Sequence, residues 1–202
     1  NNGKTIFSQI MSNIPEREFK ACVDRYKATT DQGALLEDQF LVMSYAQLTN
    51  RGSLRDIESC LTALSSRLYH CSISYTVPRN TLAKANEKRD WRIYADFAQI
   101  LVKKVRPLYA KDDFRLNLDN KVYAFDSSTI SLCLRLCPWT KFRKHKGGIK
   151  HLHIKSFYGT SENAIDLQIW IAVCTYLLLA LTKKKMHMNQ SLHTISKNVG
   201  LF

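Results

Sequence analysis

The sequence predicts a mainly α-helical protein with a small β element, and three observations lead to this fold class. Apolar residues recur at helical spacing in several segments between residues 15 and 109. Two short segments, 122–126 and 130–135, change to an alternating pattern that is typical of strands. An almost wholly apolar run from Ile169 to Leu181 predicts one buried helix in the last third of the chain.

Helices are expected throughout the first half of the chain. Pro15 suits a first helical turn, and apolar residues then recur at helical spacing up to Tyr26. Ser53 is a good N-cap, and Asp56 in the following turn complements the helix dipole. The further predicted helices cover residues 35–48, 53–64, 78–89 and 91–109, and Pro107 is expected to end or kink the last of them.

The second half is expected to open with two strands around the polar turn 126–128. A helix over 162–182 then follows, capped by Thr160 or Ser161, and an amphipathic piece over 189–197 closes the chain. The apolar run within 162–182 is short for a membrane span and is preceded by Asp166, so it predicts a buried helix and no membrane partner. We place a boundary between a helical region, 1–110, and a second region, 111–202, divided into 111–147 and 148–202.

The cysteines and the first ten residues predict the cellular compartment of the protein. The six cysteines form no CxxC pair and sit in apolar stretches, which favours reduced core residues. The first ten residues contain one Lys and no apolar block, so we expect no signal peptide and a cytoplasmic location.

The charge balance points to a polyanionic partner. Lys and Arg number 30 against 17 acidic residues, a net charge of +13 with a pI near 9.6. A surplus of this size favours nucleic acid, and the alternative is a basic protein without such a partner.

Two groups of cations are candidate DNA contacts. The predicted helix 78–89 follows another short helix, as in a helix-turn-helix reader, although the connection is longer than a tight turn. Its cations are Arg79, Lys84, Lys88 and Arg89. A second group lies in the acid-free block 141–155 and comprises Lys141, Arg143, Lys144 and Lys146. The alternative for the first group is an ordinary solvated helix face.

Few residues suggest metal chemistry. Asp126 ends a predicted strand, where a carboxylate can hold a divalent cation, although an Asp before Ser is also a common turn cap. His151 and His153 lack a second pair of ligands. Glu162 lies in the first turn of its predicted helix, where it is expected to cap the helix or to interact with its dipole, so we do not count it as catalytic.

Several long strings resemble a known family. LRDIE, residues 54–58, and TLAKANEKRDWRIYADFA, residues 81–98, are similar to the N-terminal region of bacterial insertion-sequence transposases of the "insertion sequence four" group. VYAFDSSTI, residues 122–130, and LCLRLCPWTKFR, residues 132–143, look like the first two strands of that family's catalytic domain. IKSFYGTSENA, residues 154–164, and QIWIA, residues 168–172, are similar to its C-terminal end.

The resemblance implies a helical DNA-binding region followed by an RNase H-like domain that cuts and joins transposon ends. By this likeness Asp126 is the first acid of an Asp-Asp-Glu triad and a ligand of Mg²⁺ or Mn²⁺, and Lys150 is the closing Lys of the last motif. Arg143 stands where that motif has its Glu. The chain therefore resembles a family member with an internal deletion, and residues 111–202 resemble an incomplete RNase H-like remnant with the first two strands and the last helices.

The resemblance and the chemistry together predict a transposase remnant that binds double-stranded DNA without catalysing transposition. Strand transfer needs several carboxylates to hold two metal ions, and Asp126 alone cannot supply them. Two alternatives remain: a non-catalytic inhibitor that shares DNA ends or dimer contacts with a full-length transposase, and a basic membrane-associated protein. Loss of the middle strands is also expected to leave the apolar helix uncovered and to favour self-association.

Overall fold

The computed structural model describes residues 5–26, 33–73, 75–109, 154 and 156–199. These residues form helices and connecting segments, without a strand among them. The helices are α1 (Ile6–Met11), α2 (Glu16–Arg25), α3 (Gly33–Leu48), α4 (Leu54–Ala63), the 3-10 helix η1 (Ser65–Cys71), α5 (Arg79–Lys88), α6 (Arg92–Tyr109), α7 (Glu162–Lys185) and α8 (Leu192–Val199). The predicted strands and the predicted boundary at 110 lie outside the described residues.

The mainly helical class is confirmed, and the predicted helices lie close to their expected bounds. The Ser53 hydroxyl caps α4 by accepting a hydrogen bond from the Asp56 backbone N at 3.1 Å. Ser161 caps α7 in the same way through Ala164. Pro107 does not end α6, which continues to Tyr109. The proline lies in the last turn of the helix, where few backbone hydrogen bonds are lost.

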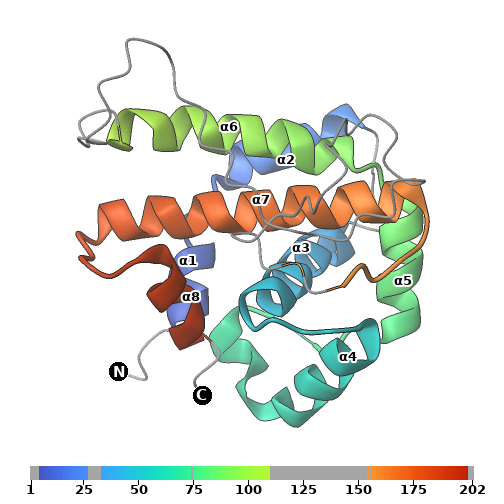
Figure 1. Ribbon diagram of the computed structural model, residues 1–202. Helices are drawn as coiled ribbons and strands as arrows, with labels where there is room; N and C mark the ends of the chain where they lie inside the picture. Colours follow the sequence, from blue (N-terminus) through green and yellow to red (C-terminus); the bar gives the residue numbers. More distant parts are fainter. Residues whose placement is uncertain (1–4, 27–32, 74, 110–153, 155, 200–202) are drawn as a thin grey trace, which may run out of the picture.

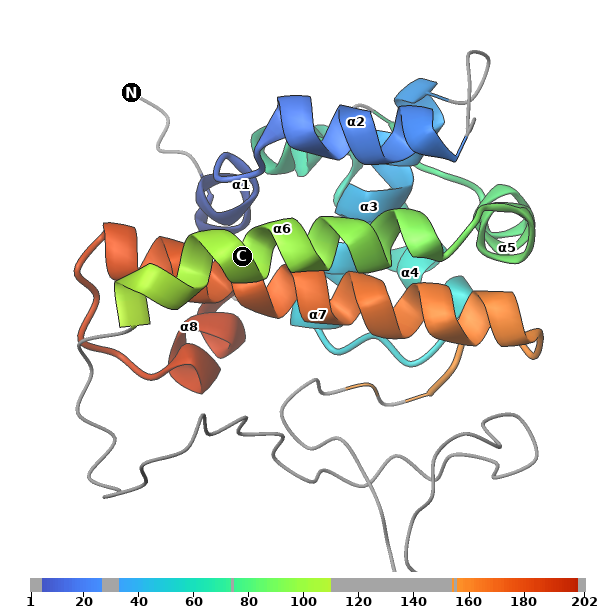
Figure 2. The same ribbon diagram turned by 90° about the horizontal axis from the view of Figure 1, so that it is seen from above.

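The long helix α7 lies at the centre of the molecule (Figures 1 and 2). It contacts α1, α3, α5, α6 and α8, and the most extensive contact is with α6. Helices α6 and α7 run side by side in the same direction: Trp91 stacks on Trp170 near their starts, and the Tyr109 hydroxyl donates to the Ala180 carbonyl near their ends.

Burial of α7 confirms one expectation and corrects another. The apolar run is buried, as predicted, with Leu178 fully enclosed. The expectation of an uncovered apolar helix is wrong, because the N-terminal helices themselves supply the cover. α7 has the length and composition of a membrane span, yet 67% of its most apolar window lies inside the protein, as in the central helix of a bundle.

An aromatic cluster joins α2 and α3 to α6. Phe19 of α2, Phe40 of α3 and Phe97 of α6 pack together, with ring centroids 4.8–5.8 Å apart. Tyr94 of α6 stacks on Phe40 at 5.9 Å. This cluster fixes α2 and α3 against α6, and α3 also contacts α7 directly.

Candidate nucleic-acid interface

Helix α5, which carries the first group of predicted DNA contacts, is held at both ends by other helices. At its start, the Glu58 carboxylate of α4 accepts a hydrogen bond from the Arg79 backbone N at 3.0 Å. This carboxylate acts as a cap in place of Pro78, which has no side-chain cap to offer. At its end, the Asn163 amide of α7 donates to the carbonyls of Asn86 at 2.9 Å and Arg89 at 2.7 Å. α5 is therefore presented on a rigid support.

Three of the four predicted cations of α5 are exposed. Lys84 and Lys88 lie on the solvent face, with no carboxylate of the described residues within ion-pair distance. Arg79 is also exposed, but its guanidinium lies 3.8 Å from the Glu58 carboxylate, which offsets part of its charge. Glu87 lies among them as an exposed acid. The strongest attraction for phosphate on α5 is thus expected at Lys84 and Lys88.

The structure corrects the inclusion of Arg89 in this cationic face. Its side chain is only 6% exposed, and Nη1 donates to Gln39 Oε1 at 2.6 Å. The Tyr94 hydroxyl donates to the same oxygen at 3.1 Å, and Gln39 Nε2 donates to Asn86 Oδ1 at 2.6 Å. Burial lowers the pKa of the Arg89 guanidinium from its usual value.

A helical-spacing argument could have found this burial. Leu82, Asn86 and Arg89 stand four and then three residues apart, so they share one face of the helix. Leu82 marks that face as the buried one. The pattern was obscured because two of the three residues are polar, and their partner Gln39 lies on a distant helix.

The arrangement of α4 and α5 differs from a helix-turn-helix with a tight turn. The two helices contact each other, but residues 64–78 connect them and contain η1. Tyr69 in η1 is 86% exposed. The pair therefore presents a polar, cationic second helix without the short connection of that motif.

The other predicted site residues lie outside the described part of the chain. They are Asp126, Lys141, Arg143, Lys144, Lys146, Lys150, His151 and His153. Within the described part, no three His, Cys, Asp or Glu side chains gather in a way that could hold a metal ion. The described cysteines, Cys22, Cys60, Cys71 and Cys174, are free thiols, and three of them are buried, in keeping with the predicted core role.

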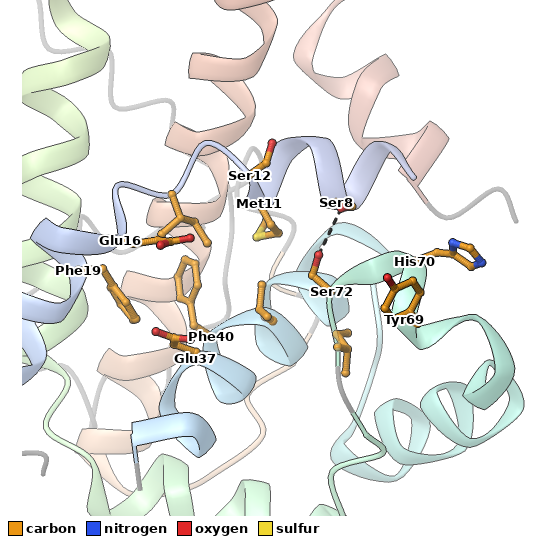
Figure 3. A pocket seen from close by; sticks show the side chains of 13 residues that line it. Ser8, Met11, Ser12, Glu16, Phe19, Glu37, Phe40, Tyr69, His70 and Ser72 are labelled. Atoms are coloured by element: carbon orange, nitrogen blue, oxygen red, sulfur yellow. Dashed lines mark hydrogen bonds between the residues drawn. The ribbon is translucent and has the colours of Figure 1, made fainter. Parts of the chain in front are cut away.

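A groove lined by residues of α1, α2, α3 and η1 has a volume of about 720 Å³ (Figure 3). Phe19 and Phe40 lie at one end, beside the carboxylates of Glu16 and Glu37. The other end carries hydroxyl groups, including Ser8 and Ser72, whose oxygens are 3.3 Å apart. The carboxylates of Glu16 and Glu37 at one end make this groove unfavourable for phosphate.

Comparison with known families gives one match. Residues 2–74 match a domain of unknown function, DUF4372, which is found in transposase-like proteins. Searches of curated proteins and of solved structures find no match. The matched segment covers α1 to η1 and ends before α5, so the exposed cations of α5 lie outside it.

Proposed function

We propose that this chain binds double-stranded DNA as the DNA-binding part of a transposase-like protein and does not itself catalyse strand transfer. The observation that carries the proposal is the exposed cationic face of α5, held in place by α4 and α7 in a chain of net charge +13. The match of residues 2–74 to a domain of transposase-like proteins supports the same context.

The chemistry of binding follows from charge. Lys84 and Lys88 stand four residues apart, so their ammonium groups lie on one face of α5. Each ammonium that neutralises a phosphate releases condensed counterions, which makes affinity depend on salt. Such contacts position a protein on the duplex but do not read its sequence.

The proposal that this chain does not catalyse strand transfer rests on the number of carboxylates available to hold metal ions. Cleavage and strand transfer use two metal ions held by several carboxylates. The resemblance supplies one of them, Asp126, and the described residues contain no further cluster that fits Mg²⁺ or Mn²⁺. Asp126 would be the ligand of any such ion. Strand-transfer turnover with Mn²⁺ that disappears in Asp126→Asn would refute this part of the proposal.

The binding experiment compares two double variants that remove the same charge. Lys84→Gln with Lys88→Gln takes two charges from α5, and Arg17→Gln with Lys20→Gln takes two from exposed positions of α2. Fluorescence anisotropy with a labelled duplex gives the affinity at several salt concentrations. We expect the α5 variant to lower the slope of log K against log salt by about 0.9 for each phosphate that is no longer neutralised, and the α2 variant to leave it unchanged. An affinity that does not fall as salt rises would reject the proposal.

A further inference from the structure

The parallel course of α6 and α7 brings two runs of cations, distant in the sequence, to the same end of the molecule. Both helices finish at the end opposite α5 (Figure 1). Val105 packs with Ala180 and Leu181, which places the last turns of α6 beside the last turns of α7. The cations on these turns are Lys103, Lys104 and Arg106 of α6 and Lys183, Lys184 and Lys185 of α7, called here the basic end.

Within the described part of the chain, little negative charge opposes the basic end. Lys104 is paired with Glu18 of α2 at 3.0 Å. For Lys103, Arg106 and Lys183, no carboxylate of the described residues lies within ion-pair distance. The sequence has no acid in α6 after Asp96 and none after Asp166.

Two of the lysines are oriented by uncharged partners. The Lys184 ammonium lies over the Tyr109 ring, 4.5 Å from its centroid, and Lys185 Nζ donates to Asn13 Oδ1 at 2.8 Å. These two contacts orient the lysines, and neither partner, an aromatic ring and a neutral amide, carries a negative charge.

The negative ends of the helix dipoles do not neutralise all the cations of the basic end. Cations are favoured in the last turn of a helix because its C-terminus carries about half a unit of negative charge. Two parallel helices that end together therefore present about one unit. Lys103, Arg106 and Lys183 alone exceed that charge, so the described residues of the basic end carry a positive excess.

We infer that the basic end is a second surface that contacts the phosphate backbone of duplex DNA, separate from α5. The inference rests on the proposed function, which supplies the class of polyanion. Val102, Leu108 and Met186 are exposed apolar side chains of the same turns. Single exposed apolar residues are ordinary on protein surfaces, so the charge identifies the partner.

The test removes one cation from each helix. Arg106→Gln with Lys183→Gln is compared with Lys84→Gln with Lys88→Gln on α5 and with Arg17→Gln with Lys20→Gln on α2, so that each variant loses two charges. Anisotropy with a duplex of about three turns gives the slope of log K against log salt. We expect the Arg106 and Lys183 variant to lower the slope by about 1.8, the value for two phosphate contacts, while the α2 variant keeps the wild-type slope. Circular dichroism confirms that each variant is folded.

The outcomes separate the two proposals. If the α5 variant lowers the slope and the Arg106 and Lys183 variant does not, the basic end is not a DNA surface and the proposed function stands. If the full chain shows no salt-dependent binding, both proposals fail. If the Arg106 and Lys183 variant binds DNA normally but no longer binds phosphatidylserine vesicles, the partner of the basic end is an anionic lipid surface, which overturns the inference.

Discussion

A single buried arginine has a role very different from that of its exposed neighbours. Arg89 joins α5 to α3 through Gln39, and the Tyr94 hydroxyl of α6 reaches the same amide oxygen. The carboxylate of Asp38 is also buried and attracts the Arg89 guanidinium. A charged group in a helical core is tolerated only when its donors are satisfied, so this network fixes where α5 sits.

We expect Arg89→Met to lower the free energy of unfolding by about 2–4 kcal/mol, because it leaves Asp38 without its nearby positive charge and takes a donor from Gln39. Lys88→Met, one residue earlier and exposed, is the control and should change stability by less than about 0.5 kcal/mol. Urea unfolding followed by circular dichroism measures both. Equal midpoints for the two variants would show that the network contributes nothing.

Tyr158 should make stability depend on alkaline pH. Its hydroxyl donates to the Arg51 carbonyl at 2.8 Å, and burial raises its pKa to about 12. The unfolded tyrosine ionises near pH 10, roughly, so its contribution is complete below that pH and is lost as pH rises to the folded value. The steepest loss for one such group is about 1.4 kcal/mol per pH unit.

Tyr158→Phe tests this dependence, since other buried tyrosines affect the variant and the wild type alike. Chemical denaturation between pH 9 and pH 11, roughly the start of this window, should show a shallower fall in stability for the variant. Parallel curves would mean that the folded and unfolded states titrate Tyr158 at the same pH.

At the scale of elements, local patterns predicted the helices because spacing and capping are local properties. Ser53 and Ser161 mark helix starts that the structure confirms. α1 and η1 were not predicted, since six or seven residues are too few for a helical period to show. The cover over α7 was not predictable either, because most of it comes from helices that lie far earlier in the sequence.

The candidate site was predictable only in part, for a related reason. The cationic character of α5 could be predicted from Lys84 and Lys88, which the structure places on the surface. The burial of Arg89 and the pairing of Arg79 with Glu58 depend on other helices, so composition alone could not reveal them.

The start of α5 depends on a carboxylate from another helix. We expect Glu58→Ala to destabilise the protein by about 1 kcal/mol, because the Arg79 backbone N then loses its acceptor. Glu87→Ala removes an exposed acid from α5 itself and serves as the control. Thermal unfolding of the two variants should differ, with the Glu58 variant melting first. A Glu58 variant as stable as the control would show that water replaces the cap without cost.

At the scale of the whole molecule, the segment that matches a known domain is not a closed folding unit. Residues 2–74 contain Phe19 and Phe40, but their ring partners Tyr94 and Phe97 lie beyond the match. Thr175 of α7 also donates a hydrogen bond to the buried Ser44 hydroxyl. The matched segment therefore needs α6 and α7 to bury its apolar faces.

We expect a fragment of residues 1–74 to show no cooperative unfolding transition, whereas the full chain should show one. Removing α6 and α7 exposes the aromatic cluster to water, and the short helices left are marginal alone. Differential scanning calorimetry and binding of a hydrophobic dye compare the two. A sharp transition in the fragment, without dye binding, would contradict the dependence.

The central position of α7 also bears on the order of folding. Its hydrogen bonds reach back 80 residues to Tyr94, 131 to Ser44 and 169 to Asn13. Such separations are large for a helical protein, and closing long loops slows folding. During synthesis α1, α3, α5 and α6, which contact α7, leave the ribosome before it. Their apolar faces stay exposed to water until α7 is available to cover them. This protein should thus fold only after α7 has been synthesised, and it should need chaperone protection until then.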